Sequence, residues 1–112
     1  MKRPDLKTLE ELVLLTVIIQ AGHAYGVSIK QALAKEEKRP INISSIHSTL
    51  RQLLEKGFVQ SKWSEASTER GGHRKRIFNI SARGRKALEE ARDTKVKLWA
   101  QISDFLPKMI QL

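Results

Sequence analysis

The fold is decided by a run of four consecutive segments: SSIHSTLRQLLEKG (44–57), FVQSKW (58–63), SEASTERGGHRK (64–75) and RIFNI (76–80). Apolar residues in the first segment recur every three or four positions, which predicts a helix from about Ser44 to Glu55. The second and fourth segments have the short apolar pattern of β-strands. Because the polar segment between them contains two consecutive glycines, we expect a β-hairpin with a long, basic loop.

Two helices are predicted before this run. Apolar residues at three- and four-residue steps predict a helix over residues 8–20, with Thr8 as its N-cap and Glu11 completing a capping box. A second helix is predicted from about Gly26 to Lys38. It ends there because an Arg-Pro dipeptide follows, and the residue before a proline avoids helical angles.

A longer helix is predicted after the run, from about Ser81 to Leu106, where Pro107 breaks or kinks it. At 1.5 Å per residue this helix would be about 35 Å long, more than three short helices can cover. Its exposed apolar end must therefore find a partner, most simply a second copy of the chain. The residues expected at this homodimer interface are Leu88, Leu98, Trp99, Ile102, Phe105, Leu106 and Met109.

The order of these elements is typical of a winged helix-turn-helix, a mainly α fold with a small β-hairpin (α+β). The length of the chain, 112 residues, is typical of a single domain with one hydrophobic core. We expect residues 1–80 to form the winged helix-turn-helix domain and residues 81–112 to form a dimerisation helix, joined as one compact unit. The hairpin is the wing of this fold.

The charge of the chain is concentrated in one place. The sequence has 21 Lys and Arg against 12 Asp and Glu, a formal net charge of +9. Residues 70–86 hold seven basic residues and no acidic one, whereas residues 87–112 have four of each sign. Such a block indicates a polyanionic partner, and nucleic acid is favoured because the block coincides with the predicted wing.

Several other functions are disfavoured by composition. The absence of cysteine excludes a disulfide scaffold, a thiol nucleophile and a Cys-ligated zinc site. The three histidines are far apart in sequence and lack a carboxylate pattern, so no metal site, cofactor or enzymatic activity is expected. The longest apolar stretch, Leu12–Ile19, is too short to span a bilayer, and the first residues do not resemble a signal peptide. We therefore expect a cytoplasmic location.

The predicted wing and third helix supply complementary candidates for contact with double-stranded DNA. A helix fits the major groove, where small polar side chains allow close approach to the bases. On the helix these candidates are Ser44, Ser45, His47, Ser48, Thr49, Arg51 and Gln52. The wing would lie along the backbone or in the adjacent minor groove through Arg70, His73, Arg74, Lys75 and Arg76.

The sequence resembles the PadR-like family of transcriptional regulators. The matching pieces occur in order over about residues 8–90, and together they are more specific than any one alone. They are the first helix, the Ala-Tyr-Gly turn (24–26), the segment 45–57, the wing GGHRKRIF (71–78) and the entry to the last helix. The short remainder of the chain resembles the small subfamily with one C-terminal helix.

This resemblance implies a dimeric DNA-binding regulator, usually a repressor, whose C-terminal helices pair with those of a symmetry mate. His47 stands where the family usually has a phosphate-contacting tyrosine. Tyr25 is either a packing residue or a further phosphate contact. Trp99 is either a packing residue at the dimer interface or, as the small subfamily permits, part of a pocket for a small apolar or aromatic effector.

Other classes of function compete with DNA binding. A winged helix that binds RNA or the ribosome would also use a basic wing, but the chain is only 5% aromatic and has no aromatic cluster on a strand to stack unpaired bases. A protein-interaction module would not need such a concentration of arginines. We therefore expect a homodimeric DNA-binding regulator that recognises a pseudo-palindromic operator.

Overall fold

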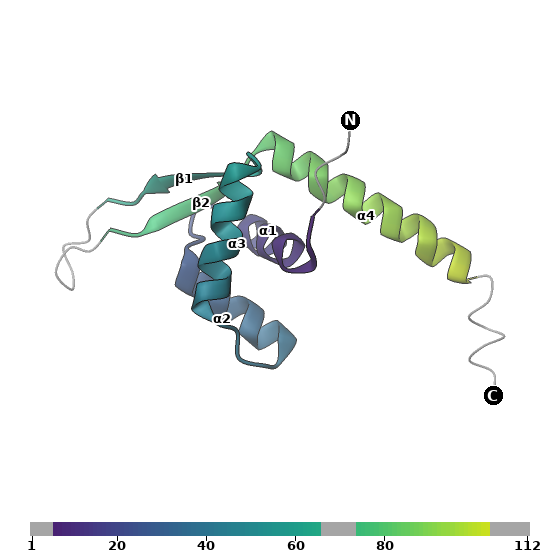
Figure 1. The fold of residues 1–112 in the computed structure, drawn as a ribbon, viewed down its shortest axis with the longest axis horizontal. Coiled ribbons are helices and arrows are strands. Elements are labelled where there is room, and N and C mark those ends of the chain that lie inside the picture. Colours follow the sequence, from purple (N-terminus) through teal and green to yellow (C-terminus); the bar gives the residue numbers. More distant parts are fainter. Residues whose placement is uncertain (1–5, 66–73, 104–112) are drawn as a thin grey trace.

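The computed structural model describes residues 6–65 and 74–103. Four helices and a two-stranded antiparallel sheet follow one another in the predicted order (Figure 1), and they are α1 (Thr8–Ile19), α2 (Gly26–Glu37), α3 (Ile43–Glu55), β1 (Val59–Trp63), β2 (Arg76–Ile80) and α4 (Ala82–Ser103). The predicted α+β winged helix-turn-helix is therefore confirmed. The predicted end of the last helix at Leu106 lies outside the described residues.

The core lies where α1, α2 and α3 meet, and the root of the hairpin closes it. Each helix contributes the apolar stripe that its periodicity predicts, and the burial of these side chains is the main force that holds the helices together. The fully buried members are Val13, Leu14, Val17, Ile29, Ile46, Leu50, Leu53 and Phe58. Leu54, next to Leu53 on α3, is only half-buried.

The start of α1 differs from the prediction by one residue. Lys7, not Thr8, is the N-cap, and its N–H donates to the carboxylate of Glu10, not Glu11, at 2.8 Å. Glu10 also binds Lys56 at the end of α3. This distant contact fixes the position of Glu10 in the capping turn, and no local pattern in the sequence reveals it.

The ends of α2 and α3 follow local rules more closely. Asn42 caps α3, because its Oδ1 accepts from the N–H of Ser44 at 2.7 Å. Gly57 follows α3 with a φ of +75°, a left-handed conformation that suits glycine. The helix α2 ends at Glu37, and Lys38 adopts a φ of 55° before the Arg-Pro dipeptide.

The hairpin is attached to the helical core through its backbone. Strands β1 and β2 pair from Val59 with Ile80 to Trp63 with Arg76. The Phe78 N–H donates to the Ala24 carbonyl at 2.8 Å, which joins β2 to the loop between α1 and α2. The wing is therefore held in a fixed position relative to the start of α2.

A second attachment holds α4 at its first turn. Ser81 Oγ donates to the Gly57 carbonyl at 2.6 Å and accepts from the Gly84 N–H at 3.0 Å. The Ser81 N–H donates to the Phe58 carbonyl at 3.0 Å. Gly84 packs so closely on this corner that a Cβ at its position would lie 2.1 Å from the Phe58 carbonyl oxygen. From this corner α4 crosses α1 and then projects away from the helical core (Figure 1).

Candidate nucleic-acid interface

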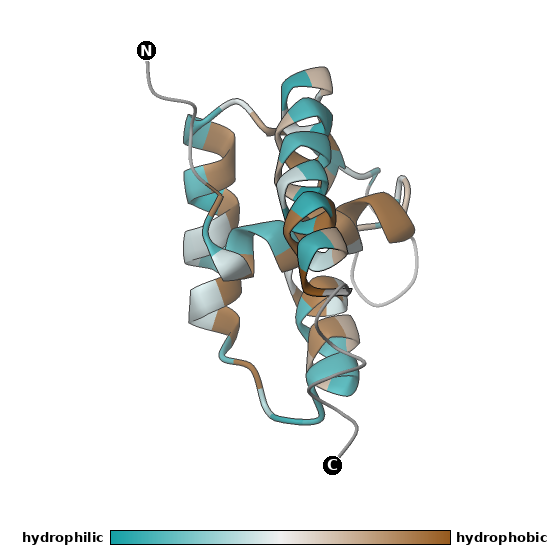
Figure 2. Ribbon diagram, turned by 90° about the vertical axis from the view of Figure 1, so that its right-hand side faces the viewer, coloured by the Kyte–Doolittle hydropathy of each residue, from teal (hydrophilic) through white to brown (hydrophobic). Residues whose placement is uncertain are grey.

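The outer side of α3 is polar and open to solvent. The hydrophilic residues of this helix, the left-hand one in Figure 2, line its outer side, while its hydrophobic residues face inward. Gln52 is half-buried at the edge of this side. The predicted contact residues that the structure exposes are Ser44, Ser45, His47, Ser48 and Arg51. The amphipathic period of α3 thus presents one long cation and several small hydroxyl groups on a single surface.

Thr49 does not belong to this surface. Its exposed fraction is only 6%, because it follows Ile46 by three residues and precedes Leu50 on the packed side of α3. It borders a shallow groove against the start of α1, together with Leu9 and Glu10. The prediction that Thr49 reaches a base is therefore wrong. The exposed residues of α3 on either side of Thr49 remain the candidates for base contacts.

His47 lies directly on the first residue of α2. A Cβ at Gly26 would lie 2.6 Å from His47 Cε1, so only a glycine leaves space for the imidazole in this position. The ring remains exposed to solvent while its edge rests on the α2 backbone. Gly26 therefore leaves room for the side chain of His47 against the start of α2.

Tyr25 connects the start of α2, where His47 lies on Gly26, to the wing. Lys75 Nζ lies 4.4 Å from the centroid of the half-buried Tyr25 ring, a cation–π contact between the wing and the N-terminus of α2. Since Tyr25 is adjacent to Gly26 and Gly26 contacts His47, these four residues form a continuous path from the wing to α3. The two elements expected to contact DNA are therefore joined, although their residues are distant in sequence.

The described part of the wing is a cluster of exposed cations. Arg74, Lys75 and Arg76 are all exposed, and no carboxylate in residues 6–65 or 74–103 pairs with them. Arg70 and His73, which were also expected to contact DNA, lie outside the described residues. Such unpaired cations attract phosphate groups.

A buried ion pair that the sequence analysis missed supports α3. The Glu10 side chain is 1% exposed, and its two oxygens accept from Lys56 Nζ at 2.8 and 2.9 Å. The Lys56 side chain is 28% exposed, so the pair lies at the border of the core. It fixes the C-terminal end of α3 to the N-terminal turn of α1. A glutamate in the first turn is ordinary for a helix, so its sequence context gives no signal of this role.

We expect loss of this pair to destabilise the protein. Glu10→Ala removes the buried carboxylate that binds both Lys56 and the Lys7 N–H, and unfolding in urea should show a loss of about 2 kcal/mol. Glu10→Gln keeps a neutral acceptor and should lose about half as much. The matched control is Glu11→Gln, whose partner Lys95 is 56% exposed, with an expected loss below about 1 kcal/mol. If Glu10→Ala and Glu11→Gln lowered the free energy of unfolding equally, the stabilising role of the Glu10–Lys56 pair would be contradicted.

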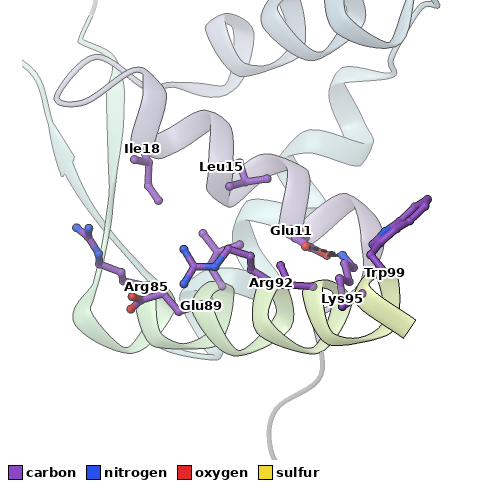
Figure 3. Close-up of a pocket in the computed structure, with 11 residues that line it drawn as sticks. Glu11, Leu15, Ile18, Arg85, Glu89, Arg92, Lys95 and Trp99 are labelled. Atoms are coloured by element: carbon purple, nitrogen blue, oxygen red, sulfur yellow. Dashed lines mark hydrogen bonds and ion pairs between the residues drawn. The ribbon is translucent and has the colours of Figure 1, made fainter. Parts of the chain in front are cut away.

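A separate groove of about 760 Å³ runs between α1 and α4. Its apolar lining includes Leu15 and Ile18 of α1 and Val96 and Trp99 of α4. Figure 3 shows Leu15 and Ile18 directed from α1 toward α4, and the ion pair between Glu11 and Lys95 bridging the two helices. The groove is open, and much of its apolar lining faces solvent.

The residues predicted for a dimer interface divide into three groups. Leu98, Trp99 and Ile102 are exposed by 54%, 63% and 39%. Leu88 is instead buried in the core of its own chain, because it lies in the part of α4 that crosses α1, so its placement in an exposed interface was wrong. The remaining three, Phe105, Leu106 and Met109, lie outside the described residues.

Among the described residues, no group of three His, Cys, Asp or Glu side chains is arranged to hold a metal ion. Within the same part of the chain, no helix has the length and apolar character required to cross a membrane.

Comparison with solved structures identifies the fold. A PadR-like transcription factor from Bacteroides fragilis has a TM-score of 0.70 and 21% identity, with 87% of this chain and 88% of that chain covered. A PadR family transcriptional regulator from Eggerthella lenta has a TM-score of 0.62 and 22% identity, with coverage of 92% and 86%. RosR of H. salinarum, in a structure grown from NaBr, has a TM-score of 0.62 and 20% identity, with coverage of 94% and 82%.

Comparison of sequences identifies the family. A search of curated proteins finds no significant match to the chain. The model of the transcriptional regulator PadR-like family, in contrast, matches residues 14–90, which include α2, α3, the hairpin and the first part of α4. The matched segment thus contains the exposed side of α3, the cations of the wing and the Tyr25 contact between them. The chain is a member of the PadR-like family of DNA-binding transcriptional regulators.

Proposed function

We propose that the protein is a homodimeric repressor that binds a pseudo-palindromic operator. The observation that carries this proposal is the path from the exposed wing cations through Tyr25 to the exposed side of α3. A helix and a wing held in one fixed arrangement can contact the major groove and the adjacent backbone at the same time. Two copies related by a two-fold axis would contact two half-sites about one helical turn apart.

The two elements have different roles in this proposal. The wing cations Arg74, Lys75 and Arg76 bind phosphates and supply affinity for any duplex. Gln52 and Arg51 have the functional groups that form paired hydrogen bonds with adenine and guanine edges, and the small serines beside them permit close approach. Tyr25 and His47 lie between these regions and would contact the phosphates at the edge of the major groove.

The proposed dimer uses the projecting part of α4. Leu98, Trp99 and Ile102 are large apolar side chains exposed on one helix, and single chains seldom leave such a stripe uncovered. Of these three side chains, Trp99 also lines the groove against α1. A second copy would cover this surface by an isologous contact, which also provides the symmetry that a palindromic operator requires.

The groove between α1 and α4 is the proposed place of an effector. Trp99 offers an aromatic face beside the apolar side chains of Leu15 and Val96, which suits a small apolar or aromatic molecule. Charged side chains, among them Arg92 and Lys95, complete the lining of the groove. Because α4 would carry the dimer contacts, a ligand here could alter the distance between the two α3 helices. Operator binding in the cytoplasm would then respond to the concentration of that molecule.

The proposal is tested by selecting bound sequences from a random duplex library and measuring their affinity by fluorescence anisotropy. We expect two inverted half-sites about ten base pairs apart and a 2:1 ratio of protein to duplex. Affinity should fall steeply with salt, with a slope of about −0.9 for each phosphate neutralised. Selection of a single unpaired half-site, or preference for structured RNA in competition, would refute the proposal.

Removal of two wing cations should weaken binding to every duplex alike. Because Arg74 and Arg76 are exposed and no described carboxylate pairs with them, Arg74→Ala with Arg76→Ala should reduce affinity at least about tenfold and lower the salt slope by about 1.8. Lys97→Ala removes a cation from α4, outside the wing and α3, and should change affinity less than about twofold. If the double variant lost preference for the selected operator but kept its affinity for random duplex, the proposed division of roles would be wrong.

A further inference from the structure

Trp63 is a large aromatic side chain left open to solvent on the wing. It is the last residue of β1, and its exposed fraction is 63%. Tryptophan is usually well buried in folded proteins, and its indole N–H usually has a partner when it is buried. In the described structure this indole contributes nothing to the core, so its position requires another explanation.

The register of the hairpin determines which way Trp63 faces. Alternate residues of a strand face the same side, so Trp63 shares a face with Ser61 and Val59 and with their paired residues on β2. At the root of the hairpin this face is buried through Val59 and Phe78, which belong to the hydrophobic core. Trp63 continues the same apolar face beyond the edge of the core.

Arg76 is fixed beside Trp63 on this face. It is paired with Trp63 across the two strands. Its Nε donates to Ser61 Oγ at 3.0 Å, and its guanidinium carbon lies 5.6 Å from the centroid of the Phe78 ring. These contacts restrict the side chain before any partner binds, and no described carboxylate neutralises it. The face therefore carries a positioned cation next to an exposed indole.

The charges around this pair specify the chemistry of the partner. Lys62, Arg74 and Lys75 are exposed nearby in sequence, and Glu65 is the one acidic residue among the described positions of the wing. A partner must therefore present negative charges together with apolar surface suitable for an aromatic ring. The backbone of duplex DNA has both, since each phosphate is flanked by the C–H surface of deoxyribose.

We propose that Trp63 is a direct and sequence-independent DNA contact of the wing. Its ring packs on a deoxyribose at the edge of the minor groove, and its indole N–H donates to a phosphate oxygen while Arg76 binds a neighbouring phosphate. This inference rests on the proposed function, because it assumes that the wing lies on the DNA backbone. It adds an apolar anchor to a surface whose other contacts are electrostatic.

The chain contains a matched control for this proposal. Its two tryptophans, Trp63 on the wing and Trp99 on α4, have the same exposed fraction of 63% in the single chain, and Trp99 lies on the surface that the proposed dimer covers. Trp99→Phe leaves Trp63 as the only tryptophan, and Trp63→Phe leaves Trp99. Quenching of each by acrylamide is measured with and without saturating duplex, and binding is followed separately by the anisotropy of labelled DNA.

We expect DNA to lower the quenching constant of Trp63 at least about twofold and to leave that of Trp99 nearly unchanged. Trp63→Ala should reduce affinity about tenfold for operator and random duplex alike, and Trp63→Phe, which keeps an aromatic ring, should recover most of it. The midpoint of urea unfolding should stay near that of the parent protein for both variants, because the side chain is exposed.

Three outcomes would overturn the proposal. If anisotropy shows binding but Trp63 remains fully accessible to acrylamide, the wing binds DNA without this residue, and a protein partner becomes the better explanation of the exposed indole. If Trp63 is shielded but Trp63→Ala keeps its affinity, the residue is only a bystander. If the parent protein itself does not bind duplex DNA, the proposed function fails and this inference fails with it.

Discussion

Gly84→Ala should strongly destabilise the protein, although it replaces glycine by alanine within a helix. In an unobstructed helix this change stabilises by about 0.5–1 kcal/mol, because alanine has the higher helix propensity. Here a Cβ would lie 2.1 Å from the Phe58 carbonyl oxygen and 2.9 Å from its carbonyl carbon. Backbone atoms cannot rotate away as a side chain can, so α4 must shift from its corner. We expect a loss of about 3 kcal/mol in the free energy of unfolding, measured in urea.

The control for this substitution is Gly22→Ala. Gly22 has a φ of +80°, but no atom lies within 4 Å of the position of its Cβ. Alanine there should lose only about 1 kcal/mol, the strain of a left-handed backbone. A Gly84→Ala protein as stable as its parent would show that α4 does not pack on Phe58 as the structure has it.

The second large effect is expected at the exposed stripe of α4. Leu98→Glu with Ile102→Glu places two carboxylates on the surface that the proposed dimer buries, where an uncompensated charge is very unfavourable. Both residues are exposed in the single chain, so the fold itself should remain intact. Analytical ultracentrifugation should then show a monomer, and operator affinity should fall at least about a hundredfold, because one half-site must bind alone.

Lys97→Glu serves as the control for charge on the same helix. Lys97 is exposed and does not line the groove against α1, so its replacement changes the local charge without entering the proposed interface. We expect Lys97→Glu to remain dimeric and to bind the operator nearly as well as the parent. A normal dimer after the double substitution would rule out the interface on α4.

The sequence predicts the architecture well because the architecture depends on local signals. The period of the apolar residues defines the helices, and Asn42, Gly57 and the Arg-Pro dipeptide mark their ends through capping and backbone rules. The hairpin follows from a change of period together with consecutive glycines. Each of these signals lies within a few residues of the feature that it determines.

The features that the sequence did not predict depend on contacts between distant residues. In the sequence, Glu10 resembles an ordinary glutamate in the first turn of a helix. Only the structure shows that Lys56, far along the chain, forms an ion pair with it. Thr49 is polar and was expected outside, yet its hydroxyl group is small enough for the packed side of α3. The contact of Lys75 with Tyr25 likewise depends on how the wing sits on α2, which no single segment specifies.

The corner formed by Gly57, Phe58, Ser81 and Gly84 has a mechanical consequence. Hydrogen bonds and close backbone packing hold the first turn of α4 there, and farther along the helix the ion pair of Glu11 with Lys95 links α4 to α1. In the proposed dimer, α4 would therefore act as a lever that is fixed at its first turn. A small change in the tilt of α4 relative to α1 would become a larger displacement at the far end of the helix. Substitutions in the groove would then change how strongly an effector alters operator affinity. The operator sequence that α3 recognises would stay the same.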